Sequence, residues 1–213
     1  MAFPYRLLTL LVGICWSGFQ CSAQSPADAF RWDWNASEEL TGKDSISQSK
    51  ALPVKESARL IEAVASELRP RTSTLDIKSE KQLLEVAAQT RIKAVDLSGK
   101  GVGEFMAQGV DELCSPTGNC EFWVLRQDGD GYSVLLHSTA TQTFTIQPTL
   151  TNGFHDIVLG QHGSAFMQGL RLYRFDGSKY RRAACYEANW RISEKDDKVR
   201  ELKEPKITPC KTR

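Results

Sequence analysis

His162 and Ser164 come closest in this sequence to a catalytic pair. An imidazole near a hydroxyl, with a carboxylate supplied from elsewhere, is the chemical composition of a hydrolytic triad. Ser164 lacks the G-x-S-x-G turn that exposes the nucleophilic serine in one large class of hydrolases. We therefore assign no catalytic residue and expect His162 to be a polar residue of a loop between strands. A hydrolase acting through His162 is kept as an alternative.

The other two histidines show no pattern of a reactive or metal site. His155 precedes Asp156 in a predicted strand, where adjacent side chains point to opposite faces, so the two cannot act as a pair. His137 is expected at a strand end, in a structural or rim position. No two histidines have the spacing of a zinc site. The sequence therefore predicts no metal and no cofactor.

Four cysteines lie beyond residue 23, and an even number in an exported chain predicts two disulfides. Three pairings are possible. Cys114 and Cys120 flank the turn-forming run 115–119, so the simplest pairing joins these two and leaves Cys185 with Cys210. The C-x5-C spacing differs from the C-x-x-C spacing of redox motifs.

Export itself is predicted from the first residues. Arg6 is followed by the apolar stretch Leu7–Phe19 and by a small residue, Ala23, at the expected cleavage site. The apolar stretch has about 13 residues, whereas a membrane span needs roughly 20. We expect residues 1–23 to be a signal peptide, the mature chain to be secreted or periplasmic, and no membrane span to remain. Lipidation and an uncleaved anchor are less favoured.

The elements that must position these residues begin after a polar leader, expected over residues 24–52. Its aromatic patch, Phe30–Trp34, could dock on another molecule, although packing on its own domain is favoured. Apolar residues at helical spacing follow Pro53 and end at Pro70, and a weaker pattern covers Glu80–Gln89. One or two N-terminal helices are therefore expected.

From residue 91 the sequence has the texture of short strands and contains an internal repeat. Arg126 and Tyr132 match Arg174 and Tyr180 at an offset of 48, and an Asp-Gly turn lies between the members of each pair. We predict an α+β fold, mainly antiparallel β, built from two similar four-stranded units that bury their apolar faces on each other or beneath the first helix. The single helix-plus-β domain should span residues 53–190, followed by a charged tail, 191–213, pinned by a disulfide.

The run Asp96–Glu104 resembles the D-x-[DN]-G-D-G-x-x-[DE] loop of FG-GAP and VCBS-type repeats. Residues 83–190 as a whole resemble a group of uncharacterised exported bacterial proteins. The resemblance implies a compartment and a β-repeat style of fold, and no activity. The family's loop often holds calcium, which takes six to eight oxygen ligands. Ser98 and Lys100 replace expected ligands here, so we expect a metal-free structural turn.

Charge excludes one large class of partners. The full sequence has 27 Lys and Arg against 26 Asp and Glu, and signal cleavage removes Arg6 and no acid, which leaves 26 of each. A neutral chain has no bulk attraction to nucleic acid or anionic lipid. The basic run 179–182 is interpreted as a solvated strand end rather than a phosphate site.

We predict an exported, non-catalytic binding or inhibitor-type module of the cell envelope, with a protein or envelope component as its partner. A structural envelope component is a second alternative, beside the hydrolase. Matched loops of a repeat project to the same side, so the loops 108–121 and 161–169 should lie near each other and carry the site. The expected binding residues are Asn119, Trp123, His162 and Ser164.

Overall fold

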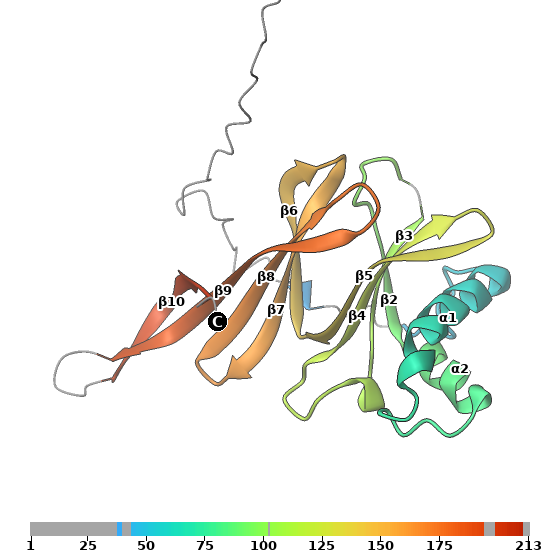
Figure 1. Ribbon diagram of the computed structural model, residues 1–213, viewed down its shortest axis with the longest axis horizontal. Helices are drawn as coiled ribbons and strands as arrows, with labels where there is room; N and C mark the ends of the chain where they lie inside the picture. Colours follow the sequence, from blue (N-terminus) through green and yellow to red (C-terminus); the bar gives the residue numbers. More distant parts are fainter. Residues whose placement is uncertain (1–37, 40–43, 102, 194–198, 211–213) are drawn as a thin grey trace, which may run out of the picture. The chain divides into compact units, whose positions relative to one another are not determined.

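The computed structural model describes residues 38–39, 44–101, 103–193 and 199–210 of the chain (Figure 1). The expected signal peptide, residues 1–23, and the aromatic patch Phe30–Trp34 lie outside the described residues. In the part that is described, no helix is long and apolar enough to cross a membrane.

The first helix forms where apolar residues recur at spacings of three and four. Helix α1 (Val54–Leu68) begins after Pro53, and its fully buried residues include Leu60, Val64 and Leu68. A short 3-10 turn, Arg69–Arg71, follows it. The proline within that turn cannot continue an α-helix without loss of a hydrogen bond, which accounts for the end of α1.

The second helix, α2 (Glu80–Gln89), has a capped N-terminus. The Ser79 hydroxyl oxygen accepts a hydrogen bond from the backbone N–H of Gln82 at 3.2 Å, which satisfies one of the free amides of the first turn. Leu83 and Ala87 are fully buried, one turn apart. Both expected helices are therefore confirmed.

The first antiparallel sheet has four strands in the order β2-β3-β4-β5. Its strands are β2 (Arg91–Val95), β3 (Glu104–Gln108), β4 (Cys120–Asp128) and β5 (Gly131–Thr141). A 3-10 turn, Asp111–Leu113, lies in the connection between β3 and β4. The turn from β4 to β5 contains Gly129 at φ +55°, a conformation that glycine adopts without strain from a Cβ atom.

The second antiparallel sheet has six strands in the order β1-β6-β7-β8-β9-β10. Its strands are β1 (Glu38–Glu39), β6 (Thr143–Thr151), β7 (Phe154–Ser164), β8 (Met167–Phe175), β9 (Tyr180–Ser193) and β10 (Val199–Pro209). The expected α+β class, mainly antiparallel β with N-terminal helices, is confirmed. The second sheet is larger than the four strands expected, because β1 and β10 are added at its two edges.

Alternation along β4 separates two hydrophobic cores. Trp123 and Leu125 belong to the core beneath the helices, whereas Phe122 and Val124 belong to the core between the two sheets. Adjacent residues of a strand point to opposite faces, so the four-stranded sheet is buried on both sides. Figure 1 shows α1 and α2 beside β2–β5, on the side away from β6–β10.

The structure differs from the expected organisation at both ends of the domain. Residues 44–52, expected in the leader, include Ile46, which is fully buried and whose N–H donates to the carbonyl of Thr90 at 2.9 Å. Residues expected in a trailing tail extend β9 and form β10, which pairs with β9. The alternation of apolar and polar residues in this charged stretch is too weak to identify a strand. The strand forms because its backbone pairs with β9.

The segment 161–169 is also not the loop that was expected. Strands β7 and β8 continue through it, and only Ala165 and Phe166 form the turn between them. Gly163 and Ser164 suggested a loop, but the pairing of Ser164 with Met167 across the hairpin carries the strands to the tip.

Candidate functional site

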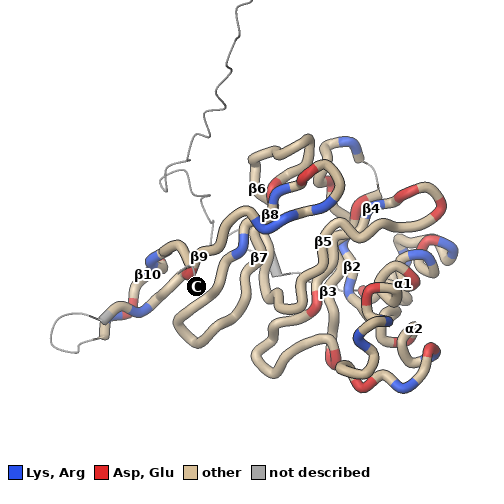
Figure 2. Tube along the Cα trace, in the orientation of Figure 1, with Lys and Arg blue, Asp and Glu red and all other residues tan. Residues whose placement is uncertain are grey.

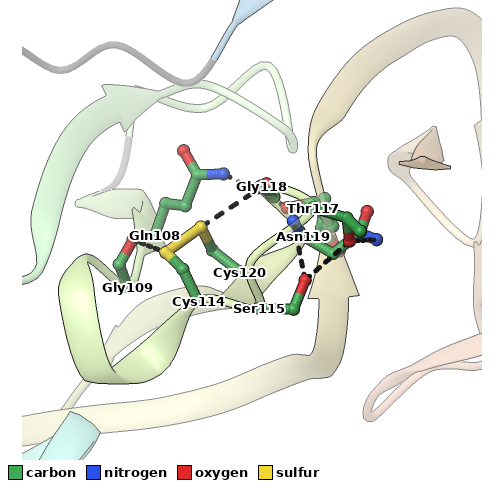
Figure 3. The surroundings of a disulfide bond; sticks show 9 residues. Gln108, Gly109, Cys114, Ser115, Thr117, Gly118, Asn119 and Cys120 are labelled. Atoms are coloured by element: carbon green, nitrogen blue, oxygen red, sulfur yellow. Dashed lines mark hydrogen bonds between the residues drawn. A yellow bond between two sulfur atoms is a disulfide. The ribbon is translucent and has the colours of Figure 1, made fainter. Parts of the chain in front are cut away.

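The first component of the candidate site is the loop between β3 and β4, closed by a disulfide. Cys114 and Cys120 are bonded, and so are Cys185 and Cys210, as expected. Within the loop, the N–H of Ser115 donates to the carbonyl of Asn119 at 2.7 Å, and the N–H of Gly118 donates to the carbonyl of Ser115 at 2.9 Å. The hydroxyl oxygen of Ser115 also accepts a hydrogen bond from the N–H of Asn119 at 3.2 Å (Figure 3). These bonds and the disulfide make the loop rigid.

Asn119 joins this loop to the β7 strand of the other sheet. Its Nδ2 donates to the carbonyl oxygen of His162 at 2.9 Å, and its Oδ1 accepts from the N–H of His162 at 2.7 Å. Asn119 is 7% exposed, so these bonds form largely out of water. The expectation that the two segments lie near each other is therefore confirmed.

A hollow of about 430 Å³ opens beside His162, where β7 turns into β8. Its volume falls in the range of about 300–1,000 Å³ typical of small-ligand sites. The apolar part of its lining is Ala165, Phe166, Met167, Trp190 and Leu202, and the polar part is Gln142, His162, Ser164, Gln168 and Glu201. Apolar walls with a few polar groups are typical of a binding site.

Short-range contacts hold the walls of this hollow in place. The backbone N–H of Trp190 donates to the carbonyl of Phe166 at 2.9 Å, which ties β9 to the β7–β8 turn. The guanidinium of Arg191 lies 3.2 Å from the centre of the Phe166 ring and donates to Glu201 at 2.7 Å. A cation over an aromatic face, paired with a carboxylate, orders all three side chains.

The geometry at His162 and Ser164 does not form a nucleophile and its base. The hydroxyl oxygen of Ser164 accepts a hydrogen bond from the N–H of Phe166 at 3.4 Å, across the hairpin turn. Within the described residues, the His162 ring and the Ser164 hydroxyl share no hydrogen bond. What the structure brings together here is Asn119, His162 and Ser164, three of the four residues expected to bind.

Trp123, the fourth expected binding residue, is placed elsewhere. Its side chain is fully buried in the core beneath the helices, so it is not positioned to touch a ligand. Its indole stacks on the ring of His137, with centroids 5.3 Å apart and an interplanar angle of 14°. Trp123 therefore has a structural role in this fold, which is the usual role of an aromatic residue at a central strand position.

A polar cluster that the sequence did not reveal lies over this stack. Glu121, 4% exposed, accepts a hydrogen bond from Nε2 of His137 and another from Nη1 of Arg71, each at 2.5 Å. Glu67 of α1 lies 3.4 Å from the other ring nitrogen of His137. The one signal available was the alternation of Glu121 with Trp123, which places both on the same face of β4.

The pKa of Glu121 is set by opposing effects. Burial raises the pKa, while the hydrogen bonds from His137 and Arg71 and their positive charges lower it, and the pKa is lowered overall. The two charge-assisted hydrogen bonds that this carboxylate accepts connect the first sheet to the 3-10 turn after α1, and Glu67 adds a contact from α1 itself.

In the turn that resembles a calcium loop, the carboxylates accept hydrogen bonds from backbone N–H groups of the turn itself. Asp96 accepts a hydrogen bond from the N–H of Lys100 at 3.1 Å. Glu104, almost fully buried, accepts from the N–H groups of Leu97 at 2.6 Å and Ser98 at 3.1 Å. Among the described residues, no group of three or more His, Cys, Asp or Glu side chains is arranged to hold a metal ion.

Acidic and basic residues are interspersed along the helices and strands, as Figure 2 shows.

Comparison of the chain with family models, with curated proteins and with solved structures gave no match.

Proposed function

We propose that this chain is an exported, non-catalytic binding or inhibitor-type module, and that its site is the hollow beside His162. The observation that carries the proposal is the pair of hydrogen bonds between Asn119 and the backbone of His162. They fasten the rim of the hollow to a disulfide-closed loop of the other sheet. A rim held in this way loses little entropy when a partner binds.

The lining of the hollow suggests what the partner presents. Phe166, Met167 and Leu202 offer an apolar floor, and His162 and Glu201 add hydrogen-bonding groups. An apolar side chain flanked by backbone or amide groups would match both, as in protein interfaces where one buried anchor is surrounded by a polar rim. A protein of the cell envelope is therefore the partner we favour.

The chemistry of Ser164 favours binding over hydrolysis. Its hydroxyl oxygen accepts a hydrogen bond within the hairpin turn instead of facing a base. The alternative is a purely structural component of the envelope. A binding module needs the residues that line the hollow, whereas a structural component would tolerate changes to them.

The test is capture of envelope proteins from an extract of the host by the immobilised chain starting at Gln24. The wild type is compared with His162→Ala and Phe166→Ala, and with Leu150→Ala as a control, since Leu150 is 60% exposed and lies outside the hollow. All variants are first shown to melt as the wild type does.

We expect at least one protein to be retained by the wild type and by the control, and to be lost from both hollow variants. Its affinity, measured with the purified partner, should fall by about tenfold or more, since a buried anchor contact is worth about 2 kcal/mol. Equal retention by all four proteins would place the site elsewhere and contradict the proposal.

A further inference from the structure

A second hollow, of about 290 Å³, lies between β5 of the first sheet and the start of β9 in the second. Residues 134–137 line one wall, residues 179–182 line the other, and Glu67 and Tyr173 line the rest. None of the described residues lines both this hollow and the one beside His162. Its volume is just below the range of about 300–1,000 Å³ typical of sites for drug-sized ligands, so it suits a small chemical group. We call it the β5–β9 hollow.

Each of the two strands at this hollow carries a β-bulge. Leu135 is an extra residue of β5 without a register partner on β4, and Ala183 is an extra residue of β9 without one on β8. Leu135 lines the hollow, and Ala183 directly follows Arg182, which also lines it. A bulge bends its strand and re-aims the neighbouring side chains, and bulges are over-represented next to functional sites. Both walls therefore depart from regular strand geometry at the same place.

The basic wall, residues 179–182, is firmly held. Tyr180 is 4% exposed, and its hydroxyl donates a hydrogen bond to a backbone carbonyl of β7 at 2.8 Å. Asp176 accepts hydrogen bonds from the guanidinium of Arg181 and from the backbone N–H of Lys179, each at 2.8 Å. The sequence pattern favoured a solvated strand end for this run, and the structure adds that its middle is anchored in the core between the sheets.

The side chains at the hollow that have no partner are all hydrogen-bond donors. Among the described residues, the Lys179 ammonium, the Arg182 guanidinium and the Tyr173 hydroxyl form no ion pair or hydrogen bond. Tyr173 pairs with Arg182 across β8 and β9, so these two side chains lie on the same face of the sheet. The acid in the lining, Glu67, already lies 3.4 Å from a ring nitrogen of His137.

We propose that the β5–β9 hollow binds an oxyanion, the phosphate or carboxylate group of a small molecule. Arg182 supplies a planar fork of N–H groups that matches two oxygens of such a group, Lys179 supplies a point charge, and Tyr173 supplies a neutral donor. The wall formed by β5 is mostly apolar, and hydrogen bonds to a charged group are stronger where water is partly excluded. The inference goes beyond the proposed function, because this site is separate from the hollow beside His162.

The test is an NMR titration of the isotope-labelled chain that starts at Gln24. Inorganic phosphate is the first probe and acetate the second, each at constant pH and ionic strength. The wild type is compared with Lys179→Ala and Arg182→Ala, and with Lys100→Ala as the control. Lys100 lies in an exposed turn outside the hollow, so its replacement changes the net charge equally without touching the site. All variants are first shown to melt as the wild type does.

We expect phosphate to shift the backbone N–H signals of residues 134–137 and 179–182 in a saturable way. The Kd should rise about tenfold or more in Lys179→Ala and Arg182→Ala, because each loses a charge-assisted hydrogen bond. It should stay within about twofold of wild type in Lys100→Ala, since a distant exposed charge is screened by salt.

Two conservative variants separate the roles of the donors. Arg182→Lys keeps the charge and loses the fork, so its affinity should lie between those of the wild type and Arg182→Ala. Tyr173→Phe removes only a hydroxyl and should weaken binding several-fold. Tighter binding of phosphate than of acetate assigns the site to phosphate compounds, and the reverse order assigns it to carboxylates.

The proposal would be overturned if neither anion gave a saturable shift at the residues of the β5–β9 hollow. Equal Kd values for the wild type, Lys179→Ala and Arg182→Ala would overturn it as well, because the anion would then bind without these cations. His162→Ala should bind phosphate as the wild type does, which keeps this test independent of the proposed function.

Discussion

Asn119, in the loop before β4, and His162, in β7 of the second sheet, are 43 residues apart in the chain, yet the side-chain amide of Asn119 bonds both the N–H and the C=O of His162. An amide that satisfies a donor and an acceptor of the same residue acts as a short piece of β-ladder. It fixes the edge of β7 against the disulfide-closed loop, and it determines where the imidazole of His162 is presented.

Replacement of Asn119 by alanine should destabilise the domain and loosen this edge. The variant would lose the two hydrogen bonds to the backbone of His162 and a third to the hydroxyl of Thr117. The backbone groups of His162 left unpaired should cost about 1–3 kcal/mol. Urea unfolding measures the loss, and Lys100→Ala, in an exposed turn, is the control that should stay within about 0.5 kcal/mol of wild type. An unchanged midpoint for Asn119→Ala would show that the bond contributes nothing to stability.

Glu121 should make the stability of the domain fall in acid. Its pKa in the folded state is lowered below the ordinary value of 4.5 by His137 and Arg71, against the effect of burial. The stabilisation is therefore complete above pH 4.5 and is lost as the pH falls through the lower, folded-state pKa.

Glu121→Gln should remove that part of the acid dependence. It should also destabilise the domain at pH 7 by about 3 kcal/mol, because Arg71 and His137 lose their shared partner. Free energies of unfolding measured at several pH values between 3 and 7 check both effects. Glu85→Gln, whose ion pair with Lys81 is exposed, should follow the wild type. Parallel profiles for wild type and Glu121→Gln would refute the assignment.

The two disulfides should contribute unequally to stability. The loop-closure model gives about 3.5 kcal/mol for the 25-residue separation of Cys185 and Cys210, and about 2 kcal/mol for the separation of six between Cys114 and Cys120. Melting of the two Cys→Ala double variants should follow this order. Peptide mapping without reduction checks the pairing, and a Cys114–Cys185 link would contradict it.

Calcium should leave the melting temperature unchanged. The carboxylates of Asp96 and Glu104 already accept hydrogen bonds from backbone N–H groups of their own turn, and binding an ion would cost those bonds. A ligand that binds only the folded state adds about 2.7 kcal/mol of stability at a hundredfold excess over its Kd. A clear upward shift with calcium that Asp96→Ala abolishes would show that the turn is a metal site.

Local sequence determined the two helices, because the residues that specify each of them lie close together in the chain. Ser79 caps the start of α2 and the spacing of Leu83 and Ala87 is helical, and apolar residues at helical spacing after Pro53 specify α1. The cysteine spacing also gave the shorter disulfide, since residues so close in the chain cannot lie far apart. In each case the physical cause is a backbone or side-chain preference that acts at short range.

Tertiary structure alone decided what depends on partners far away in the chain. Glu121 is an ordinary strand residue in the sequence, and it becomes a buried brace because pairing places His137 beside Trp123 and packing brings Arg71 over the sheet. Strand β10 exists because β9 offers it an edge, although its own residues are mostly charged. The hollow beside His162 is likewise assembled from β7, β8, β9 and β10, and no local pattern records it. Hydrogen bonding and burial between strands act on whatever side chains the register brings together, and register is set by the whole sheet.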